Sequence, residues 1–198
     1  TTETELWNGS AWTEVNDLAN KKREMASCGT STAGLVFGGE LPSPFSAENE
    51  SWNGSSWTEL ADLNTARQRP GGVGLQTAAL CFGGDKDPLT TYADETELWN
   101  GSSWTEVNDM NTARHGMGSM GTSTKAMGCS GYTGSVVGNT EQWNGTSWTE
   151  VNDVNESRTI GAGAGKSTTS AGLFFGGWGP GDIAKTEEFN SVFTVSTE

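Results

Sequence analysis

The hydrophobic positions of this chain form short, strand-length runs bounded by Gly, Asn, Asp and Ser, with no apolar pattern at helical spacing. One segment, Glu-Leu-Trp-Asn-Gly-Ser-Ala-Trp, begins at Glu5 and recurs with small changes from Glu50, Glu97 and Glu141. A fifth copy begins at Glu187 and has phenylalanine in place of both tryptophans. The first tryptophans are 45, 47 and 44 residues apart: Trp7, Trp52, Trp99 and Trp143. A period this regular indicates a repeat protein.

A second block lies between these copies and contains an arginine, a Gly-rich run and an apolar run that ends in Gly-Gly. The apolar runs occupy residues 34–39, 79–84 and 172–177, and the third copy departs by reading Met-Gly-Cys-Ser-Gly at 127–131. We expect four strands per period. The Gly-rich run is the first (25–30, 72–77, 116–122 and 160–166), the apolar run the second, and the two tryptophan segments the third and fourth. Four short antiparallel strands in about 45 residues predict an all-β propeller.

The two tryptophan strands are joined through Asn-Gly, a strong hairpin signal. A two-residue turn at Asn8-Gly9 would pair Trp7 with Ser10, whereas a four-residue connection places Trp7 opposite Trp12. We favour the second register, because it gives every hairpin a cross-strand pair of indole rings.

Counting strands gives a single domain with an N-terminal half-blade and four full blades, about five blade positions. The half-blade covers residues 1–16, and the blades cover about 22–60, 66–107, 113–151 and 157–196. The surplus half-blade has three explanations: a fragment of a longer ring, an irregular five-bladed ring, or closure by another copy. We expect residues 1–16 to be ordered against the blade of residues 22–60, with the exposed strand edge covered by the C-terminal blade, by a second copy in a homo-oligomer or by parent sequence.

The double glycine that closes an apolar strand, followed by an acidic-aromatic strand and a Trp strand, resembles the kelch repeat across essentially all 198 residues. Tryptophan stands where that family usually has tyrosine, and the third repeat lacks the glycine pair. The resemblance implies the propeller of kelch proteins and of the galactose oxidase central domain. Related oxidases hold copper with Tyr and His ligands. One histidine (His115) and two tyrosines cannot build that site, so we expect no enzyme activity and no cofactor.

The net negative charge of the chain excludes some classes of binding partner. The chain carries 11 Lys+Arg against 25 Asp+Glu, a formal net charge of −14, which disfavours nucleic acid and anionic membrane surfaces. No apolar run approaches the roughly 20 residues of a membrane-spanning helix. Three cysteines cannot all pair and lack metal-site spacing. Cys81 and Cys129 are expected at matching repeat positions as core residues.

Several motifs have structural explanations that we prefer to chemical ones. Residues 160–168 nearly spell a phosphate-binding loop but align with the Gly-rich inner strand. Four Asn-Gly-Ser/Thr sequons coincide with the hairpin turns, where Asn-Gly serves the backbone. One aspartate per blade (Asp17, Asp62, Asp109 and Asp153) is expected to stabilise a turn, so no metal site is predicted.

Two sets of residues are candidates for ligand contact. One arginine per blade precedes the inner strand and would form a ring able to bind a carboxylate or sulfate, unless it pairs with the repeated glutamates: Arg23, Arg67, Arg114 and Arg158. The loops between the second and third strands differ among repeats and carry an aromatic residue each: Phe45, Tyr92, Tyr132 and Trp178.

These features favour a non-catalytic recognition module that binds a protein or a glycan through the loop face. The alternative is a structural or adhesive repeat module of a virion or cell-surface protein. Low lysine content, acidity and richness in Gly, Ser and Thr favour an extracellular or virion-surface location.

Overall fold

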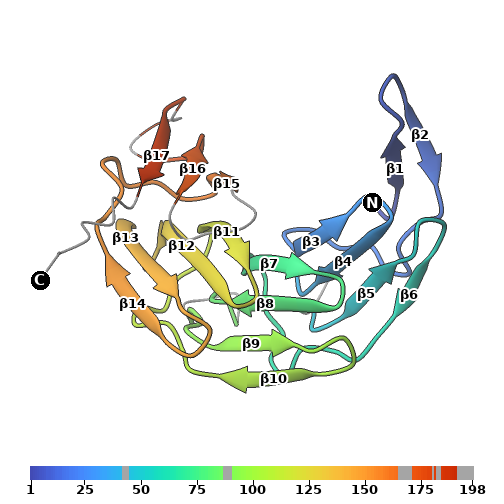
Figure 1. The fold of residues 1–198 in the computed structure, drawn as a ribbon, viewed down its shortest axis with the longest axis horizontal. Helices are drawn as coiled ribbons and strands as arrows, with labels where there is room; N and C mark the ends of the chain where they lie inside the picture. The colour runs from blue at the N-terminus through green and yellow to red at the C-terminus, as the bar shows by residue number, and fades with distance from the viewer. Residues whose placement is uncertain (42–44, 87–90, 165–170, 180, 182–183, 191–198) are drawn as a thin grey trace, which may run out of the picture.

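The computed structural model describes residues 1–41, 45–86, 91–164, 171–179, 181 and 184–190. Within these residues the chain contains strands and no helix, and they form five small antiparallel sheets in chain order. The sheets are arranged as the blades of a propeller that form an open arc, with the half-blade at one end and the last blade at the other (Figure 1). Among the described residues, no helix has the length and hydrophobicity needed to cross a membrane.

Each sheet pairs its strands in chain order, from the innermost to the outermost. The half-blade consists of β1 (Thr4–Trp7) and β2 (Trp12–Val15). The first full blade has β3 (Ala26–Thr30), β4 (Ala33–Phe37), β5 (Asn49–Trp52) and β6 (Trp57–Glu59). The second has β7 (Gly71–Leu75), β8 (Ala78–Phe82), β9 (Thr96–Trp99) and β10 (Trp104–Val107). The third has β11 (Gly118–Thr122), β12 (Lys125–Tyr132), β13 (Val136–Trp143) and β14 (Trp148–Val151).

The fourth blade has β15 (Ala162–Ala164), β16 (Ala171–Phe175) and β17 (Thr186–Asn190). The fourth strand expected from the sequence, with Phe193, lies outside the described residues, as does the end of the predicted inner strand at 165–166. The part of the phosphate-loop-like segment that is described, β15, pairs with β16 as a strand of the blade.

The predicted tryptophan register is confirmed. Trp7 lies opposite Trp12, and the Asn8 amide donates to the carbonyl of Ala11 at 3.1 Å, which closes the four-residue turn. The Asn8 Oδ1 atom accepts bonds from the amides of Ser10 and Ala11, so the asparagine has a backbone role in the turn. The three other tryptophan hairpins repeat this register, and the four indole pairs have ring centroids 5.4–5.6 Å apart.

The core lies between blades. The second tryptophan of one blade packs on the phenylalanine of the blade before it: Trp104 lies 4.9 Å from Phe37, and Trp148 lies 4.8 Å from Phe82. Glycine is required on the inner strands because they crowd one another. A Cβ atom on Gly72 would lie 2.6 Å from the Cβ of Ala26 in the neighbouring blade.

The double glycine is explained by the contact with the next blade. Gly38 and Gly39 have φ of 66° and 101°, a region that other residues rarely adopt. The Gly39 amide donates to the carbonyl of Arg67 at 2.8 Å, and a Cβ on Gly38 would lie 2.8 Å from that same oxygen. In the third blade Ser130 takes the first of these positions with φ of 60°, and its hydroxyl accepts a bond from the Arg158 amide at 2.8 Å.

Candidate functional site

The entrance to each blade is built on a buried cation. Arg67, Arg114 and Arg158 are fully buried, and each forms an ion pair with the glutamate on the third strand of its own blade: Glu97, Glu141 and Glu187. The other carboxylate oxygen accepts bonds from the connection before the blade. In the third blade, Glu141 Oε2 accepts from both the amide and the side chain of Asn111 at 2.7 Å. Each pair therefore fixes the connection to the blade that it enters.

The buried arginines are structural residues. The sequence left open whether they bind a ligand or pair with glutamate, and in the structure all three pair and none reaches the surface. In the last blade, burial would raise the pKa of Glu187, but bonds from Asn155 and the charge of Arg158 lower it instead. The glutamate is therefore held in its ionised form beside the arginine.

Arg23 does not occupy the equivalent position, which corrects the predicted alignment. Lys22 is the buried cation of the first full blade, with Nζ 2.7 Å from Glu50 and 2.9 Å from Glu48. Arg23 exposes 73% of its side chain and pairs with Glu40 instead. The repeats match when they are aligned on the apolar residue four positions before the cation, which is buried in three blades (Leu18, Leu63 and Met110) and partly buried in the last (Val154). A predicted ring of four equivalent arginines is therefore wrong.

The residue two positions after the cation links neighbouring blades through the main chain. Glu24, Arg69, Gly116 and Ile160 all have φ between 51° and 64°, in the left-handed region. The Arg69 amide donates to the carbonyl of Glu24 at 2.8 Å, and the Gly116 amide donates to the carbonyl of Arg69 at 3.2 Å. In the same way, the Ile160 amide donates to the carbonyl of Gly116 at 2.7 Å. These residues lie directly before the innermost strands, which contact one another from blade to blade. These four positions therefore lie next to one another at the inner end of the blades.

A cluster of aromatic and charged side chains forms at this end between the second and third blades. We name Arg69, Asp85, Tyr92, His115 and Tyr132 the entrance cluster. His115 and Tyr92 are stacked with centroids 5.4 Å apart, and Tyr132 meets both rings edge-on at 5.4 and 6.1 Å. The structure thus brings together two of the four aromatic loop residues predicted as ligand contacts.

The charged part of the cluster is anchored on Asp85. Its Oδ2 atom lies 3.4 Å from Nδ1 of His115 and 3.8 Å from a terminal nitrogen of Arg69, and accepts a bond from Gln68 at 3.3 Å. Burial, with a smaller contribution from the charge of Arg69, lowers the pKa of His115 from 6.5 to about 4. The imidazole is therefore neutral at pH 7.

Three buried polar atoms in or beside this cluster have no hydrogen-bond partner within the described part of the chain: Arg69 Nε, His115 Nδ1 and Gln68 Oε1. Buried polar atoms are normally paired, because an unmade bond costs about 1–3 kcal/mol. Aromatic rings beside a buried donor (Arg69 Nε) and a buried acceptor (Gln68 Oε1) are suited to a ligand that offers both a face to stack and groups to hydrogen-bond.

Phe45 takes the loop position of Tyr92, because it bridges to Glu40 as Tyr92 bridges to Asp85. Trp178 takes the position of Tyr132, because it bridges to Thr159 as Tyr132 bridges to His115. Trp178 is 51% exposed. Among the described residues, no ring contact connects either Phe45 or Trp178 to the entrance cluster.

The sequence did not single out Arg69, Asp85 or His115 as site residues. The available signal was that the two positions after the repeated cation differ in every blade.

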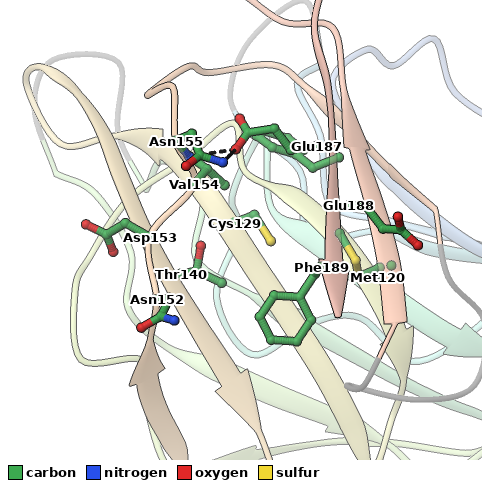
Figure 2. A pocket seen from close by; sticks show the side chains of 12 residues that line it. Met120, Cys129, Thr140, Asn152, Asp153, Val154, Asn155, Glu187, Glu188 and Phe189 are labelled. Atoms are coloured by element: carbon green, nitrogen blue, oxygen red, sulfur yellow. Dashed lines mark hydrogen bonds between the residues drawn. The ribbon is translucent and has the colours of Figure 1, made fainter. Parts of the chain in front are cut away.

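A separate pocket of about 270 Å³ lies between the third and fourth blades (Figure 2). Cys129 lines it at the position held by Phe37 and Phe82 in the earlier blades, beside the ring of Phe189. Cys81 matches Val36 instead, so the predicted equivalence of Cys81 and Cys129 is wrong by one residue, although both are buried as expected. Burial raises the pKa of the Cys129 thiol to about 12, which makes it unreactive.

Within the described residues, no three His, Cys, Asp or Glu side chains are grouped so that they could hold a metal ion. No protein-family model matches the sequence, and the search of curated proteins gives no match.

Proposed function

We propose that this propeller is a non-catalytic recognition module that binds a protein or glycan ligand on its loop face, with the entrance cluster at the centre of the site. The observation that supports this most directly is the packing of Tyr92, His115 and Tyr132 beside buried polar atoms for which the described residues offer no hydrogen-bond partner. Tyrosine and arginine are the residue types that contribute most at binding sites. The variable loops supply specificity while the buried ion pairs keep the blades rigid.

The repeat is proposed to be of the kelch type, because the double glycines are followed by an acidic-aromatic strand and a Trp strand. We place the module on an extracellular or virion surface, which its acidity and its Gly, Ser and Thr content favour.

The test is a screen of the purified chain against a glycan array and candidate surface proteins, followed by titration of each hit. Tyr132→Ala should weaken binding about tenfold or more, since a truncated aromatic contact costs at least about 1.4 kcal/mol. Leu75→Ala is the matched control: Leu75 is 57% exposed at the far end of an inner strand, away from the blade entrance. A hit that both variants weaken equally does not bind at the cluster, and this result would refute the proposed site.

A further inference from the structure

The N-terminal half-blade presents the same surface as a strand pair that is completed elsewhere in the molecule. Residues 3–17 and 95–109 differ at a single position, Ala11 against Ser103. In the second blade, β9 of this hairpin pairs along its whole length with β8, the second strand of that blade. In the half-blade, β2 is the only partner of β1 within the part of the chain that the structure describes. An almost identical surface is thus covered in one place and open in the other.

The open surface lacks each partner that the complete blades supply. Trp99 is 1% exposed, and its Nε1 donates to Gln76 in the turn of the inner hairpin. Trp7, at the same position, is 48% exposed. Glu97 pairs with Arg67, whereas Glu5 is exposed and has no ion pair among the described residues.

A hollow marks the place of a missing phenylalanine. Trp148 donates to Thr96 and packs on Phe82, which lies directly opposite Thr96 in the neighbouring strand. Trp57 makes the same bond to Thr4 of the half-blade at 3.0 Å, but no phenylalanine of the described residues packs on it, and it is only half-buried. An apolar groove of about 450 Å³ lies here, lined by Thr4, Leu6, Trp7, Val15, Trp52 and Trp57.

We propose that the half-blade is a docking site for an inner β-hairpin of this same repeat, supplied by a polypeptide segment other than residues 1–198. The second blade defines the occupant through its own pairs: Ala79 opposite Trp99, Leu80 opposite Leu98 and Phe82 opposite Thr96. The occupant therefore places a small residue at Trp7, a leucine at Leu6 and a phenylalanine at Thr4. It also carries a cation before its first strand, which pairs with Glu5.

A second copy of the chain does not fit this description. The inner strand pairs β3–β4, β7–β8, β11–β12 and β15–β16 are all paired with the third strand of their own sheet. Releasing one would unfold the blade that contains it. The occupant must be a hairpin that is not already part of a blade.

The test uses a synthetic peptide of residues 63–84 with Cys81→Val, because valine holds this position in the first blade. The peptide contains no tryptophan, so a blue shift of protein emission on titration reports burial of Trp7. Glu5→Gln should weaken binding about tenfold, the loss of one charged hydrogen bond. Glu14→Gln is the matched control, since Glu14 is an exposed residue opposite Glu5 on the outer strand, and it should change affinity less than about twofold.

A second comparison tests the predicted phenylalanine. A peptide that also carries Phe82→Ala should bind at least about tenfold more weakly, since it leaves the groove beside Trp57 unfilled. No blue shift, equal affinity of the two peptides, or equal effects of the two glutamate variants would each overturn the proposal. Sedimentation of the protein without peptide provides one more decisive result: a dimer whose formation buries Trp7 would identify a second copy as the occupant, contrary to the proposal.

Discussion

The buried arginines give the sharpest test of how the blades are held together, and Arg114→Met is the most informative change. The Arg114 side chain donates to the carbonyls of Ser130, Thr112 and Gly128 at 3.0–3.2 Å, in addition to its ion pair with Glu141. Methionine has a similar length but no donors or charge. The variant therefore leaves three carbonyls without this donor and a buried carboxylate without its cation.

Removing one partner of a buried ion pair costs about 3–5 kcal/mol, because the remaining charge stays out of water. Glu141 keeps its two bonds from Asn111, so we expect the lower half of this range. In a domain of this size 1 kcal/mol corresponds to about 2–4 °C, so the melting temperature should fall by roughly 6–16 °C. Urea unfolding followed by tryptophan fluorescence measures the free energy directly.

Two matched variants test the alignment of the repeats. Lys22→Met removes the buried cation that pairs with Glu50 and should cost about as much as Arg114→Met. Arg23→Met breaks a pair whose arginine is 73% exposed, and it should therefore cost much less than Lys22→Met, because water screens the two charges. If Arg23→Met cost more than Lys22→Met, the assignment of Lys22 as the structural cation would be refuted.

Three further predictions use the same unfolding assay. Trp104→Ala removes the contact with Phe37 and should lower the free energy of unfolding by about 3–5 kcal/mol. Trp12→Ala changes a side chain that is 64% exposed and should lower it by less than about 1 kcal/mol. Similar losses for the two variants would refute inter-blade packing as the core. Ile160→Gly should stabilise the protein by about 1 kcal/mol, because Ile160 is 65% exposed at φ of 57°, and a loss of stability would exclude strain there. The pKa of His115 in the folded state, about 4, lies below its ordinary 6.5, so its contribution is complete above pH 6.5 and is lost as the pH falls towards 4. His115→Gln should therefore lose less stability than the wild type between pH 7 and 4.5, and parallel pH profiles would contradict the lowered pKa.

The repeat architecture could be predicted from sequence because its signals are local. The register of Trp7 with Trp12 follows from an Asn-Gly turn and from the preference for facing indoles, both contained within a dozen residues. The Gly-rich strands could be placed for the same reason, since crowding at the inner ends excludes side chains.

The blade entrance could not be aligned by residue identity. Asn20 precedes Arg23 by three residues, as Asn64 precedes Arg67, and this match is misleading. The geometry selects the position four residues after the buried Leu18, where Lys22 pairs with Glu50 as the arginines of the later blades pair with their glutamates. Burial of the apolar residue, and not the identity of the cation, sets the register.

The entrance cluster was beyond prediction because it forms between repeats. Tyr92 belongs to the second blade, His115 stands before the third blade and Tyr132 ends its second strand, so their contacts depend on how two blades are placed. Sequence periodicity describes one blade at a time and contains no information about this angle.

These contacts explain why one position at the blade entrance is constant and the two positions after it vary. The position of Lys22, Arg67, Arg114 and Arg158 is always a buried cation, because a neutral residue there would leave a buried glutamate unpaired. The next two positions face no such requirement and differ in every blade, from Arg23-Glu24 to Thr159-Ile160. The main chain of the first position still pairs within its own blade, and that of the second still joins the neighbouring blade, so both positions stay fixed at the inner end. A scaffold of this kind can change the side chains at its inner end one blade at a time while the ion pairs that hold the blades stay the same.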